Sequence, residues 1–411
     1  MMIREAYLRQ IEQWQDQKII KVITGIRRCG KSTVLQQYQE YLVRNGVSEE
    51  QIISINFEDL AYEELLDYHK LYQYLLSKIL PDQKMYIFLD EIQRVPDFEK
   101  VVDSLYIKDQ IDVYITGSNA FLLSGDLATL LSGRYIEINM LPLSFQEYRN
   151  VVNGVNVDET FAQYLKFGGM PYAAQLGHDA HRIHTYLEGI YNTILIKDIE
   201  EREKRKHKDP NKRRITDVIL LKNISRYLAS TVGSPVSLNN IAGYITSTGR
   251  KVSASTVADY VEALCEPYIF YAVQPMNVSG KQLLNTPCKY YIADLGLRNY
   301  ILPRQNYDLG FSLENVVYFE LIRRGFEVNT GRIERHEVDF VAKKDDVYHY
   351  YQVTASLTDQ RTFEREMSPF EKIHDNYPKT VLTLDRFTMG NYNGIQVDNA
   401  VDWLLDPSID A

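Results

Sequence analysis

The feature that most constrains this chain is a glycine-rich stretch near its start, GIRRCGKS at residues 25–32. It fits the pattern G-x-x-x-x-G-K-[ST], whose glycines let a loop curl until successive backbone N–H groups face one phosphate. The apolar run IIKVIT before it predicts a strand, and STVLQQYQEYLV after it predicts a helix, whose N-terminus also attracts anions. A strand, a phosphate-binding loop and a helix in this order are typical of an α/β fold.

Short apolar runs and helical patterns continue to alternate over residues 1–150. Continuous apolar strands are typical of a parallel sheet with helices on both faces, so we expect one α/β domain here. The expected strands are 19–25, 52–57, 85–90, 111–117 and 135–140, and the expected helices are 32–45, 61–79 and 96–108.

The loop residues have expected tasks in binding a nucleotide. The Lys31 side chain would reach the β- and γ-phosphates, and the Ser32 hydroxyl would bind Mg²⁺. Cys29 is either a thiol that reacts with oxidants or a small residue that the loop tolerates. The residues expected to bind the nucleotide are Gly25, Ile26, Arg27, Arg28, Cys29, Gly30, Lys31, Ser32 and Thr33.

A second motif, YIFLDE at 86–91, ends an apolar strand with two adjacent acids. Asp90 is expected to hold Mg²⁺ through water, as a Walker-B aspartate does, and Glu91 to act as general base on the attacking water. The alternative is a pair of acids at a helix N-terminus, where acids are favoured electrostatically. The strand IISINF between the two motifs is typical of ATPases, and no N-K-x-D segment is present to read guanine, so ATP is the expected nucleotide.

Three further polar residues are candidates for the catalytic site. Ser118 and Asn119 follow the strand IDVYITG, where a polar side chain can orient the attacking water, although a turn or helix cap is the alternative. Arg134 precedes the last strand and is a candidate arginine finger on the γ-phosphate, in cis or from a neighbour. Its alternative role is a surface ion pair.

These motifs resemble those of the AAA+-type P-loop ATPases of bacteria and archaea, through GIRRCGKST, YIFLDEIQ, ITGSNA, SGRYIEI and PLSFQEY. FGGMP, LIKDIEER and KYYIADLGLR are similar to a narrower group, in which the ATPase is followed by a winged helix and a C-terminal domain of unknown function. The resemblance implies a parallel sheet of order 5-1-4-3-2, with Mg-ATP at its carboxyl edge.

The pattern predicts four domains in sequence. The N-terminal one, 1–150, is the ATPase core, and it is followed by a helical lid or linker, a winged helix and an α/β domain resembling restriction endonucleases, at 151–210, 211–280 and 281–411. The run REKRKHKDPNKRR at 202–214 holds eight Lys or Arg residues. It is either part of a DNA contact through 202–265 or a solvated linker beside a winged helix that packs on protein.

The C-terminal domain places Glu314 on a helix, Asp339 in the strand HEVDF and Gln352 in the strand YYQVT. This order resembles the PD-(D/E)XK nuclease core, in which acids bind Mg²⁺ and a lysine assists the water. Thr354 stands where the lysine is expected, so we predict a nuclease-like fold that does not cleave nucleic acid. Lys343 and Lys344, on the neighbouring strand, are the nearest candidates in the sequence to replace it.

Composition excludes several classes of protein. Over 411 residues the net charge is −9, three cysteines cannot form a disulfide scaffold, and no apolar run is long enough to cross a membrane. We expect a cytoplasmic, Mg²⁺-dependent ATPase with slow turnover that acts as a conformational switch on the C-terminal domain. A nucleic-acid-binding or ATP-gated nuclease effector is the alternative, as is a scaffold that binds ATP for stability, and a protein client is left open.

Overall fold

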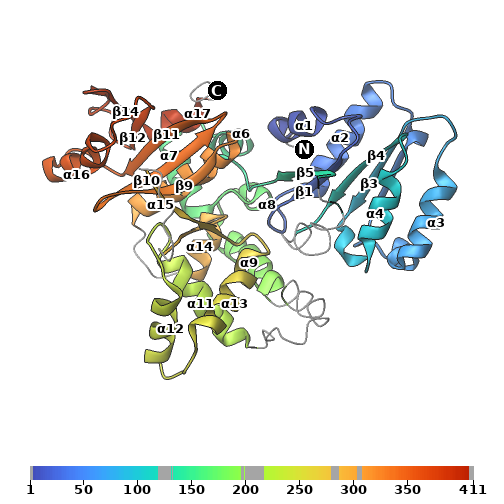
Figure 1. Ribbon diagram of the computed structural model, residues 1–411, viewed down its shortest axis with the longest axis horizontal. Coiled ribbons are helices and arrows are strands. Elements are labelled where there is room, and N and C mark those ends of the chain that lie inside the picture. Colours follow the sequence, from blue (N-terminus) through green and yellow to red (C-terminus); the bar gives the residue numbers. More distant parts are fainter. Residues whose placement is uncertain are drawn as a thin grey trace. The chain divides into compact units, whose positions relative to one another are not determined.

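The computed structural model describes residues 3–118, 131, 133–195, 199, 217–278, 287–302 and 308–406, and the chain forms two compact units (Figure 1). The N-terminal unit contains Met1–Pro142 and a short returning segment, Glu266–Tyr268. The C-terminal unit contains Leu143–Cys265 and Ile269–Ala411. Among the described residues, no helix has the length and hydropathy that a membrane crossing requires.

A five-stranded parallel sheet forms the centre of the N-terminal unit. Its strand order is β2-β3-β4-β1-β5, which is 5-1-4-3-2 when read from the other edge, the order that the family resemblance implied. Because all strands are parallel, their carboxyl ends lie along one edge of the sheet. The strands are β1 (Ile20–Thr24), β2 (Ile52–Asn56), β3 (Met85–Asp90), β4 (Ile111–Thr116) and β5 (Tyr135–Asn139).

Helices cover both faces of this sheet, which is why β1, β3 and β4 are mainly apolar and are buried along their whole length. On one face, Ile87 and Leu89 pack in a core with α3 and α4. On the other, Phe88 and Tyr114 meet the ring of Tyr38 from α2, beside which α1 lies (Figure 1). The helices are α1 (Glu5–Glu12), α2 (Lys31–Arg44), α3 (Tyr68–Lys78) and α4 (Phe98–Tyr106).

Helices make up the first half of the C-terminal unit. Three of them, α11, α12 and α13, precede the antiparallel pair β6 (Phe270–Val273) and β8 (Lys289–Ile292), in the element order of a winged helix. The helices are α6 (Phe145–Val152), α7 (Val157–Phe167), α8 (Pro171–Ala174), α9 (Ala180–Thr193), α11 (Val218–Ser230), α12 (Leu238–Ser247), α13 (Ala254–Cys265) and α14 (Leu295–Ile301).

A seven-stranded mixed sheet of order β13-β14-β12-β11-β10-β9-β7 forms the second half of this unit. The strands β9, β10 and β11 are antiparallel, and β12 joins β11 in parallel after α16 crosses between them. The elements are β7 (Pro275–Asn277), α15 (Leu309–Arg323), β9 (Glu327–Ile333), β10 (His336–Lys344), β11 (Val347–Thr354), α16 (Gln360–Glu371), β12 (Lys379–Thr383), β13 (Gly390–Tyr392), β14 (Ile395–Asn399) and α17 (Ala400–Leu405).

The motifs FGGMP and IADLGLR are joined by one buried carboxylate, that of Asp294. It accepts hydrogen bonds from the Gly169 N–H (2.6 Å) and the Leu297 N–H (3.0 Å), so it caps α14 and binds the glycine turn together. Gly168 has a φ of +78°, and a Cβ there would lie 2.3 Å from Asp294 Oδ1. These contacts explain why the turn contains adjacent glycines.

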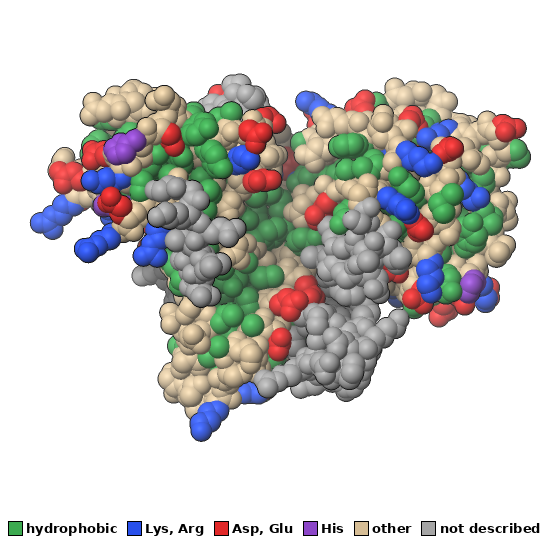
Figure 2. Space-filling view, viewed as in Figure 1, with side chains coloured by type: hydrophobic (Ala, Val, Ile, Leu, Met, Phe, Trp, Pro, Cys, Tyr) green, Lys and Arg blue, Asp and Glu red, His purple; other side chains and the backbone are tan. Residues whose placement is uncertain are grey.

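The two units differ from the four domains expected from the sequence. The N-terminal unit ends at Pro142 rather than near residue 150. Apart from Glu266–Tyr268, the residues expected to form three further domains belong to one compact unit. The basic run 202–214 lies outside the described residues. On the face seen in Figure 2, acidic and basic side chains are interspersed over both units.

Candidate nucleotide site

The glycine-rich loop connects β1 to α2 at the carboxyl edge of the parallel sheet. Its backbone takes positive φ angles at Gly25 (135°), Arg28 (68°) and Gly30 (107°), and Gly30 is the N-cap of α2. A Cβ on Gly25 would lie 2.0 Å from the carbonyl oxygen of Met140, so only glycine fits there. The loop therefore has the curled backbone that a phosphate cradle requires, as the sequence predicts.

Lys31 lies at the centre of the loop, with its side chain buried. Its Nζ donates to the carbonyl oxygens of Gly25 (2.9 Å) and Ile26 (3.3 Å) and lies 4.0 Å from the Glu91 carboxylate. The ammonium group thus stands between the loop and the acid pair.

Asp90 and its partner Thr116 lie at the ends of neighbouring strands, β3 and β4. The Thr116 hydroxyl donates to Asp90 Oδ1 and accepts from the Glu91 N–H at 2.9 Å. Burial raises the pKa of Asp90, while hydrogen bonds from the Thr116 and Ser32 side chains act in the opposite direction. Asp90 and Ser32, the two expected Mg²⁺ ligands, are therefore brought together. Sequence reasoning missed Thr116, whose only signal is its place at the end of an apolar strand.

Glu91 has a left-handed backbone, with a φ of 54°, that turns its side chain away from the strand. Its carboxylate accepts a hydrogen bond from the Ser118 hydroxyl at 3.2 Å and another from the Gln93 amide. Ser118 thus lies at the acid pair, as expected from the sequence. Asn119, the other candidate after this strand, lies outside the described residues.

Two other loop residues have defined surroundings. Arg27 pairs with Glu58, which follows β2, at 2.7 Å. Cys29 is fully buried, and burial raises the pKa of its thiol, so the thiolate that oxidants attack is disfavoured. Of the two alternatives for Cys29, the structure agrees with a small residue that packs within the loop.

The structure does not bring Arg134 to the loop. Its carbonyl oxygen accepts from the Ile20 N–H, at the point where β1 begins, so Arg134 lies at the opposite edge of the sheet. The guanidinium group pairs with Asp103 of α4 and lies 5.4 Å from the ring centre of Tyr106. The expectation that Arg134 acts as an arginine finger in cis is therefore wrong, because a residue that precedes a parallel strand lies at the amino end of that strand.

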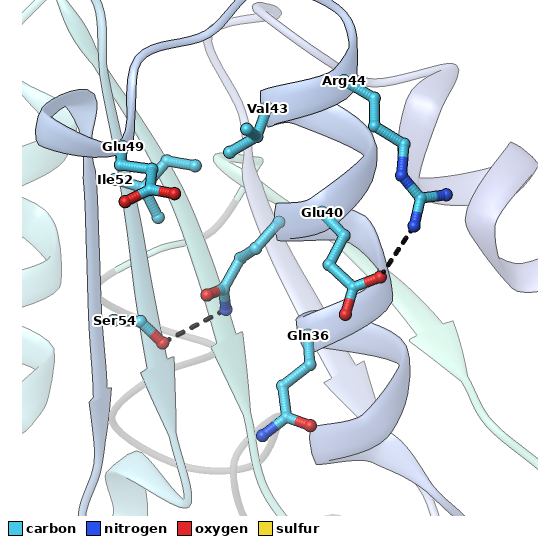
Figure 3. Close-up of a pocket in the computed structure, with 8 residues that line it drawn as sticks. Gln36, Glu40, Val43, Arg44, Glu49, Ile52 and Ser54 are labelled. Carbon is cyan, nitrogen blue, oxygen red and sulfur yellow. Dashed lines mark hydrogen bonds and ion pairs between the residues drawn. The ribbon is translucent and has the colours of Figure 1, made fainter. Parts of the chain in front are cut away.

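A hollow of about 650 Å³ lies between α2 and the edge strand β2, apart from the phosphate loop (Figure 3). Its lining is mostly polar, with a hydrogen bond between Gln39 and Ser54 and an ion pair between Glu40 and Arg44. None of the phosphate-loop residues lines it.

Comparisons with known proteins agree with this geometry. A family model described as an AAA domain matches residues 17–149, and a domain of unknown function (DUF8612) matches residues 158–308. An uncharacterized protein of Haemophilus influenzae is 37% identical over 98% of this chain and 99% of its own length. An uncharacterized protein of Methanocaldococcus jannaschii is 30% identical over 86% of this chain and 78% of its own length. The chain belongs to the family of these two proteins.

The AAA match covers the phosphate loop, the acid pair and the whole parallel sheet. The N-terminal unit is therefore a P-loop domain of the AAA type. Among solved structures, the Walker-type ATPase PABY2304 of Pyrococcus abyssi is 17% identical, with a TM-score of 0.48 over 74% of this chain and 96% of that one. The Aeropyrum pernix ORC1 protein is 16% identical, with a TM-score of 0.33 over 74% of this chain and 93% of that one.

A separate polar cluster lines a cavity of about 620 Å³ in the C-terminal unit. At its centre is Lys289 of β8, whose Nζ lies 2.9 Å from Glu314, 2.5 Å from Glu337 and 3.5 Å from Asp339. Burial alone would lower the pKa of Lys289, but the three carboxylates outweigh burial and raise it. A positive charge is therefore held among the acids by a lysine that sequence reasoning missed.

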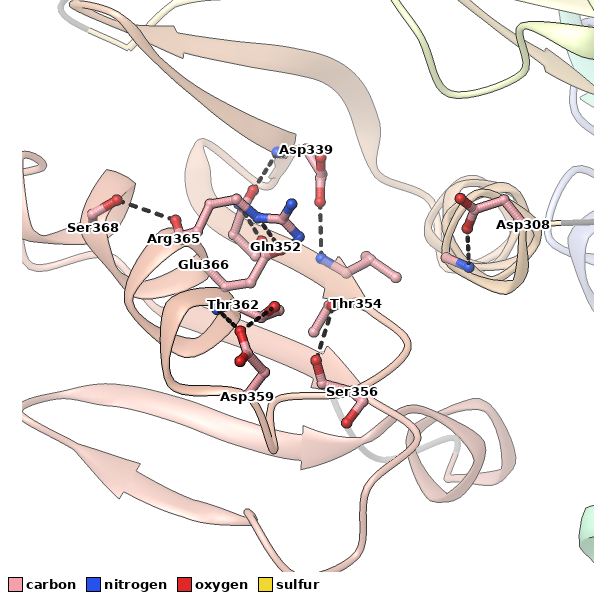
Figure 4. Close-up of polar contacts among 12 residues, drawn as sticks. Asp308, Asp339, Gln352, Thr354, Ser356, Asp359, Thr362, Arg365, Glu366 and Ser368 are labelled. Carbon is pink, nitrogen blue, oxygen red and sulfur yellow. Dashed lines mark hydrogen bonds and ion pairs between the residues drawn. The ribbon is translucent and has the colours of Figure 1, made fainter.

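The other residues expected at this cluster are also brought together (Figure 4). Asp339 accepts from the Val353 N–H at 2.9 Å, and Gln352 accepts from the Asp339 N–H at 2.6 Å and donates to Glu366 at 2.9 Å. Thr354 donates instead to the Ser356 carbonyl. Among the described residues, no three His, Cys, Asp or Glu side chains are arranged to hold a metal ion.

Lys343 is not the replacement for the expected lysine. It lies near the β10–β11 turn, and its Nζ pairs with the exposed Asp346 at 2.7 Å. Lys344 lies 5.6 Å from the ring centre of Phe326. The lysine at the cluster comes from β8, before the helix that carries Glu314.

Proposed function

We propose that the protein binds Mg-ATP in the N-terminal unit and hydrolyses it slowly. The observation that carries this proposal is the convergence of a curled glycine loop, Lys31, and the Asp90–Glu91 pair at one edge of the sheet. The cradle fits a polyphosphate because its glycines leave room for backbone N–H groups to approach it, and a lysine stands beside them. The Ser32 hydroxyl and the Asp90 carboxylate are the hard oxygen ligands that Mg²⁺ prefers.

The chain's own groups divide the chemistry among them. Lys31 exchanges the loop carbonyls for phosphate oxygens, and Asp90 and Ser32 would hold the metal ion, which neutralises charge on the phosphates. Glu91 accepts a proton from the attacking water, and Ser118 orients the Glu91 carboxylate through its hydrogen bond.

We further propose that the nucleotide acts as a conformational switch on the C-terminal unit. The returning segment supports this role, because the Tyr268 hydroxyl donates to Glu137 at 3.1 Å and Glu137 accepts from Thr24 at 2.5 Å. Thr24 is the residue before Gly25, so the point where the chain re-enters the unit is bonded next to the phosphate loop.

Calorimetric titration with Mg-ATP and release of inorganic phosphate test the proposal. The wild type is expected to bind and turn over ATP, and Lys31→Ala to lose binding, because the Lys31 ammonium group is the charge that this motif directs at the β- and γ-phosphates. Lys70→Ala is a matched control on the exposed part of α3 and is expected to behave as the wild type. Equal ATP affinity in Lys31→Ala and the wild type would reject the phosphate site.

A second candidate function is hydrolysis of nucleic acid in the C-terminal cavity, and Lys289 is the observation that favours it. The prediction of no cleavage depended on Thr354, which leaves the site without a positive charge. Lys289 supplies such a charge from another strand, within 3.5 Å of Glu314, Glu337 and Asp339. Loss of one such electrostatic group costs about 10²–10³ in rate at enzyme sites, so its presence matters.

Incubation of supercoiled plasmid and single-stranded DNA with Mg²⁺ or Mn²⁺, with and without ATP, tests this second function. Nicking that is lost in both Asp339→Ala and Lys289→Met would establish the second function. Nicking that persists in Asp339→Ala would be a contaminant. If the wild type does not nick, the cluster is a buried ion-pair network, and the original prediction is correct.

A further inference from the structure

Arg4 is a buried arginine that neither the motifs nor the proposed chemistry uses. It is the N-cap residue of α1, it is only 4% exposed, and its guanidinium group lies 4.7 Å from the ring centre of Tyr7. Its Nη1 donates to the carbonyl oxygen of Cys29 (3.3 Å) and to that of Leu141 (3.1 Å), and its Nη2 donates to that of Pro142 (3.4 Å). One cation thus binds the phosphate loop and a segment more than a hundred residues away in sequence.

On the loop side, Arg4 fixes the orientation of one peptide group. A trans peptide is planar, so its carbonyl and N–H point in opposite directions, and the structure has no cis peptide bonds among the described residues. Because the Cys29 carbonyl points toward Arg4, the Gly30 N–H of the same peptide points away from Arg4. Gly30 is the N-cap of α2, where N–H groups bind anions, so this orientation is set before any ligand arrives.

On the other side, Arg4 holds the segment through which the chain leaves the N-terminal unit, which ends at Pro142. Leu141 is held at both backbone groups, because its N–H donates to the Tyr7 hydroxyl at 3.0 Å and its carbonyl accepts from Arg4. The preceding residue, Met140, places its carbonyl against Gly25. The exit segment and the loop are therefore packed together, and Arg4 bonds to both.

We propose that Arg4 is a positioning residue that orients the Cys29–Gly30 peptide for phosphate and transmits occupancy of the loop to residues 141–142. The inference rests on the proposed binding of ATP at this loop. A phosphate that engages the Gly30 N–H fixes the Cys29 carbonyl more tightly, and the shared guanidinium group then holds the Leu141 and Pro142 carbonyls more tightly as well. The shared donor is the physical link, because all three carbonyls depend on one rigid planar group.

The test uses the full chain with Arg4→Gln, Arg4→Lys and a control, Arg9→Gln. Arg9 lies on the same helix, is exposed and pairs only locally with Glu5, so its loss tests for a general effect of removing charge from α1. Calorimetry with Mg-ATP is expected to show affinity about tenfold weaker in Arg4→Gln, a partial recovery in Arg4→Lys and wild-type affinity in Arg9→Gln.

Hydrogen exchange at the backbone amides of residues 139–141 provides the readout that a purely structural role would not move. In the wild type, ATP is expected to slow exchange there, and in Arg4→Gln it is expected to slow exchange in the loop alone. Tyr7→Phe releases only the exit side, so it is expected to speed exchange at Leu141 and to leave ATP affinity near the wild-type value.

Wild-type affinity together with wild-type exchange in Arg4→Gln would overturn the proposal. So would a weaker affinity with the response of the amides of residues 139–141 to ATP intact, because occupancy would then reach the exit segment without Arg4. If the wild type does not bind ATP, the proposed function fails and transmission fails with it. Faster exchange at the amides of 139–141 in nucleotide-free Arg4→Gln than in Arg9→Gln would still support the positioning role, and equal exchange would overturn it.

Discussion

Asp90 and Glu91 are adjacent in the sequence, but their carboxylates have different surroundings. Asp90 is buried and accepts from Thr116, and burial raises its pKa. Glu91 leaves the strand through a left-handed backbone and faces Lys31 and Ser118. Asp90, which is bonded to the Ser32 and Thr116 hydroxyls, is suited to holding a metal ion, and Glu91, which lies beside the lysine, is suited to handling a proton.

Glu91→Gln is expected to bind Mg-ATP with wild-type affinity and to hydrolyse it about 10²–10⁴-fold more slowly, because the amide keeps the shape but cannot accept the proton. Asp90→Asn is expected to weaken the binding of Mg-ATP and its dependence on Mg²⁺ together. Calorimetric affinity at several Mg²⁺ concentrations and phosphate release measure both effects. Identical behaviour of the two variants would show that the acids do not have separate tasks.

At the scale of elements, Asp294 makes the stability of the C-terminal unit depend on pH. Burial raises the pKa of its carboxyl to about 6, from an ordinary value of 3.8. The folded state therefore binds this proton more tightly than the unfolded state does. The stability that the group contributes is complete below about pH 4 and is lost as the pH rises through about 6.

Asp294→Asn removes this titration and also replaces an acceptor of the Gly169 and Leu297 N–H groups, so it is expected to destabilise the unit by about 1–3 kcal/mol. The loss of unfolding free energy is expected to be about 1 kcal/mol larger near pH 5 than near pH 7.5, because only the wild type contains the Asp294 carboxyl, whose contribution to stability is lost over that interval. Urea denaturation of both proteins at the two pH values measures it. A loss independent of pH would contradict the raised pKa.

The strands and helices also show how much of the fold and of the candidate sites the sequence can predict. The central strands β1, β3 and β4 of the N-terminal sheet are predictable because each is a mainly apolar run that is buried along its whole length, and the strand order followed from the family resemblance. The prediction for Arg134 was wrong because a residue that precedes a parallel strand lies at the amino end of that strand, and the phosphate loop follows the carboxyl end. Lys289 was missed because the expected lysine was sought beside Asp339, whereas the fold brings it from a strand 50 residues earlier.

At the scale of the whole molecule, the chain forms two compact units, each with its own sheet. Units with separate cores can unfold separately, and a ligand stabilises only the unit that binds it. The nucleotide site lies within the N-terminal unit and the Asp294 contacts lie within the C-terminal unit. Mg-ATP can therefore be used to stabilise the N-terminal unit, and Asp294→Asn to destabilise the C-terminal unit, independently of each other.

Scanning calorimetry is expected to show two transitions. Mg-ATP at about 100 times its dissociation constant is expected to stabilise the N-terminal unit by about 2.7 kcal/mol, which raises one transition by roughly 5–10 °C. Lys31→Ala is expected to abolish this shift, since the variant cannot bind the nucleotide. Asp294→Asn is expected to lower the other transition and to leave the response to ATP unchanged. If a single transition were seen and ATP raised it as a whole, the units would unfold as one cooperative block, and the switch would have to act through a rigid connection rather than through the exit segment held by Arg4.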